Sequence, residues 1–316
     1  MSNLSVSFRQ NYSAFGGVAQ YYERYGAVYR NPHEPIVAKL IKRMMEKWTS
    51  EQDNILHEIF SRSFFPFFSS SPLPSSSSSD LGGAPSCLRV LDLACGSGEA
   101  YIALRAWTDE KVRHLVAVLQ RDLDQDQEAS SSSPNDHSAL HLVMSRLSIP
   151  LPDTTKIDPE EDTEIDPTSV SSSSPSQEGE ETERVREVSP KRDPIVEIRN
   201  RLIEMQGTDP YTSNAFQERT GSECLSFSFK DIETGCFGDQ TFDMIVSSFA
   251  LHLLDKSELF GLCSQIAFLS PSLIVLTPHK RPEIAIDSGW ELVDEILFER
   301  VRARLYRSLF FVSPNS

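Results

Sequence analysis

The chain has 316 residues, 39% of them hydrophobic, and a formal net charge of −16. That length allows one α/β domain with extensions, or two small domains. The charge is uneven, because residues 120–200 hold 19 acids and 8 bases and so supply 11 of the 16 excess negative charges. A chain this acidic has no general electrostatic attraction to nucleic acid, so a nucleic-acid partner is disfavoured.

The cysteines and the N-terminal sequence indicate in which cellular compartment the protein is expected. The 5 cysteines form no CxxC pair, and no histidine cluster has zinc-ligand spacing, so we expect free thiols and no metal site. The opening MSNLSVSFRQNYSAFGG lacks the basic and apolar regions of a signal peptide. No apolar run approaches the roughly 18 residues of a membrane span. We expect a soluble protein without a membrane partner, cytoplasmic or, as the alternative, nuclear.

The N-terminal segment is aromatic and then helical. Pro35 suits the first turn of a helix. Apolar side chains then recur at helical spacing, at Ile36, Leu40, Ile41 and Met44. A further helical piece is predicted at 54–60. We predict that residues 1–62 form a helical, tyrosine-rich cap, followed by a Ser/Pro-rich linker at 63–86.

Strands and helices alternate over most of the remaining chain. The predicted strands are 88–93, 201–209, 225–231, 242–249 and 272–277, and the predicted helices are 98–107, 212–219 and 256–267. Residues 290–306 fit either a strand pair or a helix. Serine runs and acids fill much of 109–200, and we predict a disordered, low-complexity insertion at about 120–198 that interrupts a domain spanning 87–316. The alternation predicts parallel βαβ units in a doubly wound sheet, with ligands at the carboxyl ends of the strands.

A glycine turn follows the first of these strands. Residues 90–100 read VLDLACGSGEA, in which a buried strand leads into a turn and then a helix. Gly96 and Gly98 let the backbone approach a ligand where a Cβ would collide, and the helix start offers unpaired N–H groups. Asp92, at the strand end, can order the turn or meet a cationic group.

This segment resembles the first motif of class I S-adenosyl-L-methionine-dependent methyltransferases. The resemblance implies an α/β fold with a doubly wound, mostly parallel, seven-stranded Rossmann-like sheet, and S-adenosyl-L-methionine as the cofactor. It also implies that Asp92, Ala94, Gly96 and Gly98 contact the amino-acid part of that cofactor. The dinucleotide motif GxGxxG is disfavoured, because Tyr101 stands where its third glycine belongs.

The resemblance implies a second acid, which binds the ribose hydroxyls from the end of the next strand; a carboxylate can accept both hydrogen bonds of a vicinal diol. Two segments compete for this strand. Residues 116–124 lie at the usual distance from the first motif and offer Asp122 and Asp124. Residues 203–209 lie far beyond and offer Asp209. We choose Asp209, because a helix and a further strand follow it in the family's order.

Two further segments resemble later family motifs. Asp231 stands where the family places an acid or amide near the adenine amino group; a plain turn residue is the alternative. Residues 242–254, FDMIVSSFALHLL, resemble the fourth strand and its loop, which implies that Ser247 lies beside the sulfonium. His252 is a candidate general base, because imidazole titrates near neutral pH; a histidine packed at a helix start is the alternative.

The loop after the fifth predicted strand is basic. His279, Lys280 and Arg281 could meet an anionic substrate, with His279 as a second candidate for catalysis, or form a solvated turn. The chain lacks the Asn/Asp-Pro-Pro-Tyr/Phe signature of enzymes that methylate exocyclic or amide nitrogens, which disfavours such substrates.

The resemblance therefore implies transfer of a methyl group by in-line displacement to a small-molecule nucleophile, with a protein as the second choice of substrate. The cap is expected to cover the active site, or else to pack on the sheet edge. The alternative function is a catalytically inactive module of the same fold. In either case the acidic insertion could recruit a protein partner.

Overall fold

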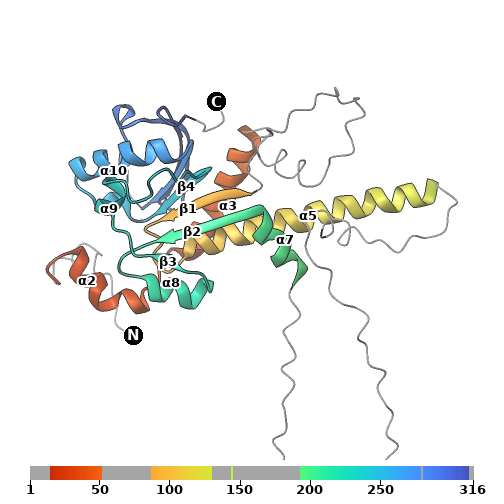
Figure 1. Ribbon diagram of the computed structural model, residues 1–316, viewed down its shortest axis with the longest axis horizontal. Coiled ribbons are helices and arrows are strands. Elements are labelled where there is room, and N and C mark those ends of the chain that lie inside the picture. The colour runs from red at the N-terminus through yellow and green to blue at the C-terminus, as the bar shows by residue number, and fades with distance from the viewer. Residues whose placement is uncertain (1–14, 52–86, 130–143, 145–192, 279, 313–316) are drawn as a thin grey trace, which may run out of the picture.

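The computed structural model of the protein describes residues 15–51, 87–129, 144, 193–278 and 280–312 (Figure 1). Three sequence predictions lie outside these residues: the helix at 54–60, the linker at 63–86 and the position of His279. Most of the predicted insertion lies outside them as well. None of the described helices is both long enough and apolar enough to cross a membrane.

Seven strands of the described chain form one sheet in the order β3-β2-β1-β4-β5-β7-β6. Their bounds are β1 (Leu88–Leu93), β2 (Ile203–Thr208), β3 (Cys224–Leu225), β4 (Met244–Ser248), β5 (Ser272–Thr277), β6 (Trp290–Phe298) and β7 (Val301–Ser308). The first five are parallel, and β7 runs antiparallel to both β5 and β6. The predicted fold class, a mostly parallel seven-stranded α/β sheet, is confirmed.

The central strands are buried on both faces, as expected for parallel strands between helical layers. Successive side chains of a strand point to opposite faces. Val90 and Val246 therefore enter one core cluster, whereas Leu91 and Ile245 enter the other. Both sets are apolar, as expected for strands that lie between two helical layers.

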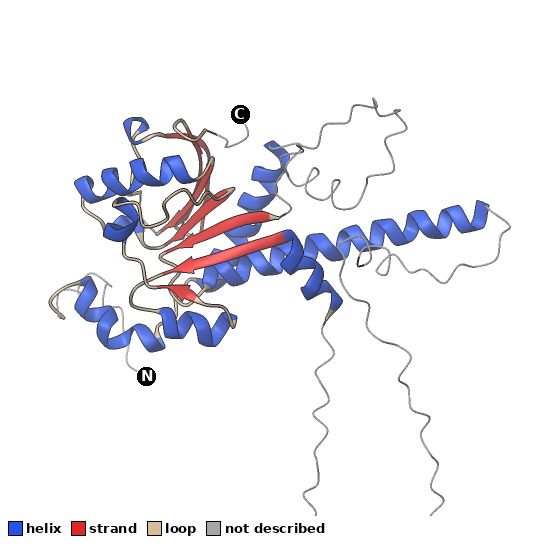
Figure 2. Cartoon of the chain, viewed as in Figure 1, coloured by secondary structure: helices blue, strands red, loops and turns tan. Residues whose placement is uncertain are grey.

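Helices cover both faces of the sheet (Figure 2). One layer holds α3 (Glu34–Glu51), α5 (Glu99–Ala129) and α7 (Pro194–Leu202), and the other holds α9 (Phe229–Glu233) and α10 (Lys256–Leu269). Two further helices, α2 (Val18–Tyr25) and α8 (Ser213–Thr220), lie on the side toward which the arrowheads of β1 and β2 point. Short 3-10 turns are η1 (Gly26–Val28), η2 (Leu251–Leu253) and η3 (Ile286–Ser288).

Local sequence signals set several helix ends. Asp255 caps α10 by accepting from the backbone N–H groups of Ser257 and Glu258, and the Glu258 side chain accepts from the Asp255 N–H. Asp193 caps α7, whose first residue is proline. Gly221 ends α8 in the left-handed conformation that glycine adopts readily.

The N-terminal helices have two different environments. The apolar face of α3 is fully buried in the core against α5, and the indole nitrogen of Trp48 donates to Ser272 Oγ on β5 at 3.0 Å. Pro35 stands in the first turn of α3, as predicted. By contrast, α2 and η1 lie beside α8, near the carboxyl ends of the strands. Within the described part of the predicted cap, α3 therefore belongs to the core, whereas α2 and η1 lie at the edge of the sheet.

Two sequence predictions are wrong in their extent. The disordered insertion is predicted at about 120–198, but α5 continues to Ala129, α7 begins at Pro194, and Met144 is buried in the core. The strand expected at 225–231 ends at Leu225, and residues 229–233 form helix α9. The C-terminal ambiguity resolves as the strand pair β6 and β7.

Candidate functional site

The turn after β1 is a strained piece of backbone at the carboxyl edge of the sheet. Ala94, Gly96 and Gly98 all have positive φ angles, of 55°, 57° and 87°. The Cys95 N–H donates to the carbonyl of Thr208 at 3.1 Å, which ties the turn to the end of β2. A positive φ is costly for alanine and persists only where the surroundings enforce it, often at functional sites.

The two glycines of the turn face different surroundings. A Cβ on Gly96 would lie 3.2 Å from the Tyr29 ring and 3.3 Å from Glu99 Oε2. A Cβ on Gly98 would lie 2.7 Å from the Thr220 methyl carbon and 3.2 Å from the Phe216 ring. Gly98 is therefore required for close packing of α8 against the turn. The lack of a side chain at Gly96 lets the Tyr29 ring of the N-terminal segment pack against the turn.

Asp92 is a buried carboxyl at the end of β1. Its Oδ2 accepts from the Tyr101 N–H at 3.1 Å, and within the described residues its Oδ1 has no hydrogen-bond partner. Burial, together with the negative charge of Glu99, raises the pKa of Asp92 to about 8. A carboxyl in this state is mostly neutral at pH 7, and a cation beside Oδ1 would favour its ionised form.

Asp209 follows β2, as the chosen strand assignment requires. Its Oδ1 accepts from the N–H groups of Tyr211 and Thr212 at 2.8 and 3.0 Å, and its Oδ2 accepts from the Gly96 N–H at 3.3 Å. Burial raises its pKa, and these N–H groups oppose the rise. The competing residues 116–124 lie within α5, so they cannot supply a strand-end acid.

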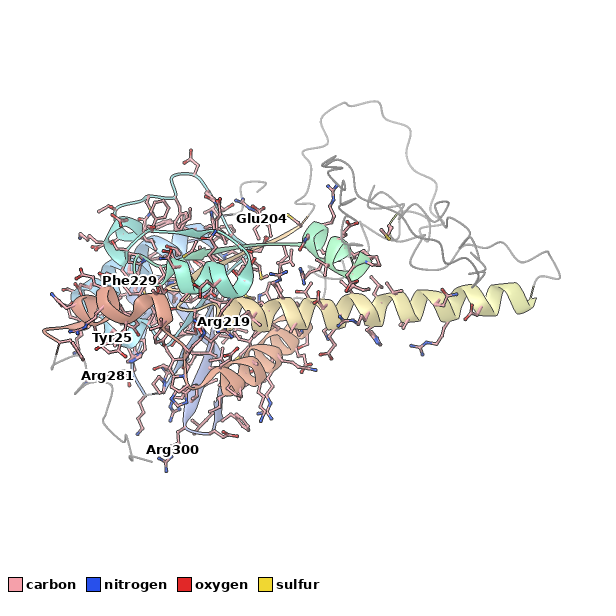
Figure 3. All side chains as sticks on the ribbon, turned by 90° about the horizontal axis from the view of Figure 1, so that it is seen from below. Tyr25, Glu204, Arg219, Phe229, Arg281 and Arg300 are labelled. Atoms are coloured by element: carbon pink, nitrogen blue, oxygen red, sulfur yellow. The ribbon has the colours of Figure 1, made fainter. Side chains whose placement is uncertain are left out.

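A third buried acid, Glu99, links the turn to the N-terminal segment. Its Oε1 accepts from the Asn31 N–H at 3.0 Å and from Arg219 Nη1 at 3.1 Å, and the Ser97 hydroxyl also donates to it. Arg219 further donates to Glu34, at the start of α3. Arg219 thus stands where α8 meets the start of α5 (Figure 3) and holds the segment and the turn together.

Aromatic side chains of the N-terminal segment lie over the strand ends. Tyr22 contacts the rings of Tyr29 and Tyr211, at centroid distances of 5.2 and 6.4 Å. The His33 ring stacks on Phe249, with centroids 5.1 Å apart. These contacts bridge the ends of β2 and β4 and place Tyr29 on the glycine turn.

The end of β4 lies beside the end of β1. Asp92 is paired in register with Val246, so Ser247 stands one residue farther along the neighbouring strand. Ser247 is buried, and its hydroxyl has no hydrogen-bond partner in the part of the chain that the structure describes. Phe249 follows with a φ of 57°, so both central strands end in a strained residue other than glycine.

His252 lies in the wall of a cavity of about 630 Å³. The cavity is formed by η2, the start of α10 and residues 281–288, and its wall includes apolar side chains such as Leu254, Leu259 and Ile284. Its charged residues are Asp255, Lys256, Arg281, Glu283 and Asp287. Leu251 in its wall comes three residues after Ser248, the last residue of β4, so the cavity adjoins the chain just beyond that strand.

The loop after β5 is held rigidly against the sheet. Buried Arg304 of β7 donates to the carbonyls of Lys280 and Pro282 at 2.7 and 2.6 Å, and the Thr277 hydroxyl donates to the carbonyl of Arg281 at 2.7 Å. Three successive carbonyls are thus fixed by side chains. The loop is a firm wall of the cavity, with the Arg281 side chain exposed.

Asp231 stands in the first turn of α9 instead of at a strand end. Its Oδ2 accepts from both the N–H and the hydroxyl of Ser228, at 2.8 and 2.7 Å, in a capping box. These bonds lower its pKa. They account for the position of this acid in a helix cap.

Sequence reasoning missed the Glu99–Arg219 pair and the place of Asn31. Glu99 could have been noticed as an acid in the first turn of a helix, where the helix dipole favours it. No local signal joins it to Arg219, because the two residues are 120 positions apart and meet only through α8.

Comparisons with known proteins give distant relatives. No family model matches the chain. An uncharacterised protein of Schizosaccharomyces pombe is 24% identical over 326 residues, which cover 97% of this chain and 94% of the relative. Among solved structures, an O-methyltransferase family protein from Burkholderia thailandensis is 11% identical, with a TM-score of 0.40, and covers 96% of this chain and 64% of its own.

Two ligand-bound methyltransferases are also similar. Magnesium protoporphyrin IX methyltransferase from Synechocystis, solved with S-adenosyl-L-methionine, is 12% identical with a TM-score of 0.27 over 35% of this chain and 61% of its own. The N-methyltransferase NodS from Bradyrhizobium japonicum, solved with S-adenosyl-L-homocysteine, is 12% identical with a TM-score of 0.28 over 36% of this chain and 71% of its own. The seven-stranded sheet, with an antiparallel β7 between β5 and β6, is the mostly parallel α/β sheet that the resemblance of the first motif implies.

Proposed function

We propose that the protein is an S-adenosyl-L-methionine-dependent methyltransferase that acts on a small molecule. The observation that carries the proposal is the buried carboxyl of Asp92, whose Oδ1 has no partner among the described residues, near the glycine turn at Gly96. A buried polar atom without a partner is unfavourable in the protein alone, so a ligand that supplies the missing donor would stabilise it. The cofactor's ammonium group is a donor of that kind.

The residues at the ends of β1, β2 and β4 fit the parts of this cofactor. Asp92, Ala94 and Gly96 would hold the amino-acid part, and Asp209 would accept from the ribose hydroxyls. Asp231 would meet the adenine amino group through Oδ1, and Ser247 would lie beside the sulfonium. When bound, the cofactor supplies an electrophilic methyl group on that sulfonium.

Binding at Asp209 requires an exchange of partners. Its Oδ2 accepts from the Gly96 N–H at 3.3 Å, which is long for such a bond, whereas the bonds to its Oδ1 are shorter. The weaker bond is the one that a ribose hydroxyl would replace. Oδ1 would remain bound to the backbone and keep the carboxylate oriented.

The cavity beside η2 is the proposed acceptor site. Its volume of about 630 Å³ suits a small organic molecule, and its apolar wall would exclude water from such a molecule. His252, in that wall, would take the proton of an acceptor that is protonated at neutral pH. Orientation of the acceptor by the rigid loop after β5 would supply much of the rate.

A two-stage experiment tests the proposal. Titration calorimetry should detect binding of S-adenosyl-L-methionine to the full chain and no comparable binding of NADH. The protein should then transfer label from methyl-labelled cofactor into the small-molecule fraction of a cell extract.

The outcomes separate the alternatives. Label in the macromolecular fraction alone would contradict a small-molecule substrate. Binding without transfer to any fraction would favour the inactive module of the same fold. If the protein failed to bind the cofactor at millimolar concentration, the proposed function would be wrong.

A further inference from the structure

Two thiols meet beneath the glycine turn. Cys95 lies within the turn, and Cys224 is the first residue of the edge strand β3. Their sulfur atoms are 3.5 Å apart, although β2 runs between β1 and β3 in the sheet. Among the described residues, the other three cysteines make no contact between sulfur atoms: Cys87, Cys236 and Cys263.

A glycine on β2 makes this approach possible. Gly207 is the register partner of Cys224, and a Cβ on Gly207 would lie 3.2 Å from Cys95 Sγ. Any larger side chain at 207 would stand on the same face, against the Cys95 sulfur. The missing side chain lets Cys95 reach across β2 to the thiol on β3.

The two thiols differ in exposure. Cys95 is fully buried, whereas Cys224 is half-buried and so is the thiol that a small oxidant can reach first. Burial raises the pKa of the Cys95 thiol well above its usual range, so that it stays protonated. Cys224 is thus the site of the first oxidation, and Cys95 is the group that resolves it.

We propose that Cys95 and Cys224 form an oxidisable dithiol pair, which hydrogen peroxide converts into a disulfide that weakens binding at the glycine turn. Formation of the disulfide depends only on the two thiols. The effect on cofactor affinity rests on the proposed function.

The chemistry takes two steps and balances with peroxide as the oxidant. In the first, the Cys224 sulfur displaces hydroxide from hydrogen peroxide, and after proton transfer the products are a sulfenic acid and one water. In the second, the Cys95 thiol attacks the sulfenic sulfur, the S–O bond breaks, and a second water leaves with the thiol proton. Peroxide accepts the two electrons that the thiols lose.

The disulfide would move the turn. Its sulfur atoms must approach from 3.5 Å to about 2.05 Å. Cys95 lies between Ala94 and Gly96, so a shift of its sulfur would strain the bonds that hold the turn, from the Cys95 N–H to Thr208 and from the Thr212 hydroxyl to the Gly96 carbonyl. A displacement of about 1 Å in the groups that position a reactant can reduce the reaction rate about 100-fold. We expect cofactor affinity to fall at least about tenfold on oxidation and to recover with dithiothreitol.

The experiment treats the full chain with hydrogen peroxide and reads out two quantities. Peptide mass spectrometry should find a Cys95–Cys224 cross-linked peptide, and calorimetry should find the loss of affinity for S-adenosyl-L-methionine. Cys224→Ser should bind the cofactor as the reduced wild type does and keep that affinity in peroxide. The matched control, Cys236→Ser, removes an exposed thiol away from the pair and should respond like the wild type.

Each outcome decides one step. Peroxide treatment that oxidises Cys236 without producing the cross-linked peptide would overturn the pair. A complete cross-link with unchanged cofactor affinity would overturn its effect on the turn. A reduced protein that does not bind the cofactor would refute the proposed function, while the cross-linked peptide would still decide whether the pair exists.

Discussion

The loops after β1 and after β5 differ in how many of their polar groups have hydrogen-bond partners. In the loop after β5, each of three successive carbonyls accepts a hydrogen bond of 2.6–2.7 Å from Arg304 or Thr277. In the turn after β1, the Gly96 carbonyl accepts from the Thr212 hydroxyl at 2.7 Å, but the Gly96 N–H makes one long contact, and the neighbouring Asp92 keeps an oxygen without a partner among the described residues.

This difference suggests that the two loops have different roles at the carboxyl edge of the sheet. A loop whose polar groups are already satisfied gains little from a polar ligand and acts as a rigid wall. A turn with unsatisfied groups and strained backbone gains stability when a ligand supplies the missing partners. Four predictions test this interpretation, from the largest expected effect to the smallest.

Substitution of Gly96 gives the largest effect. Gly96→Val would fill the space that the ligand needs, and we expect calorimetry to show a loss of cofactor affinity of about 100-fold or more. Gly238→Val is the matched control, because Gly238 has a similar φ of 53° and a Cβ there would meet no atom within 4 Å beyond its chain neighbours. Both variants carry the same backbone strain, so equal losses of affinity would contradict a binding role for Gly96.

The glycine turn is also the part of the site that the sequence predicted best. The run VLDLACGSGEA carries its structure locally, because strand, turn and helix start are consecutive. The strand β3 was overextended, because Leu225, Phe227 and Phe229 alternate with polar residues as in a half-buried strand. A local signal contradicted it: Ser228 and Asp231 have capping-box spacing, and the structure shows that they start α9.

Contacts between distant segments could not be predicted in this way. Tyr29 on Gly96 and Arg219 on Glu99 join parts of the chain that are far apart, and nothing in their local sequence indicates the partner. The length of α5 was missed for a compositional reason. Its last turns are rich in Asp and Gln, which resemble a low-complexity segment, and no core residue marks them as helix.

Asp209 gives the second largest effect. Removal of one hydrogen bond from a ribose hydroxyl to the carboxylate, worth about 1.5–3 kcal/mol, should lower cofactor affinity at least about tenfold in Asp209→Ala. Asp209→Asn keeps an oxygen for the Tyr211 and Thr212 N–H groups and should lie between the wild type and alanine. The control is Asp124→Ala, since that exposed carboxylate contacts only Gln120 on α5. A larger loss in the control would overturn the assignment of the ribose site.

Asp92 should show opposite effects on binding and stability. Its folded pKa of about 8 lies above the usual 3.8, so ionisation of this group makes unfolding easier as pH rises from about 4 to 8. Asp92→Asn removes that penalty. At pH 8.5 the variant should therefore be more stable than the wild type by at least about 1 kcal/mol, since one pKa unit corresponds to about 1.4 kcal/mol.

The same variant should bind the cofactor about tenfold more weakly, because a neutral amide attracts an ammonium group less than a carboxylate does. Urea unfolding at pH 5 and pH 8.5 measures the first effect, and calorimetry measures the second. At pH 5 the stability difference should be smaller. A stability gain that does not grow with pH would show that Asp92 is not held in its neutral form.

The loop after β5 should give the smallest effect on cofactor binding. Arg304→Lys replaces a planar group that reaches two carbonyls and Glu295 with a single ammonium, which cannot hold all three. Hydrogen exchange of the amides in residues 280–288 should speed up about tenfold, while cofactor affinity stays within about twofold. Arg302→Lys alters only the more exposed contact with Glu295 and should change neither quantity. In this interpretation, the rigidity of the loop after β5 does not affect the turn that binds the cofactor. If Arg304→Lys lowered cofactor affinity as much as Asp92→Asn does, the two loops would instead act as one unit.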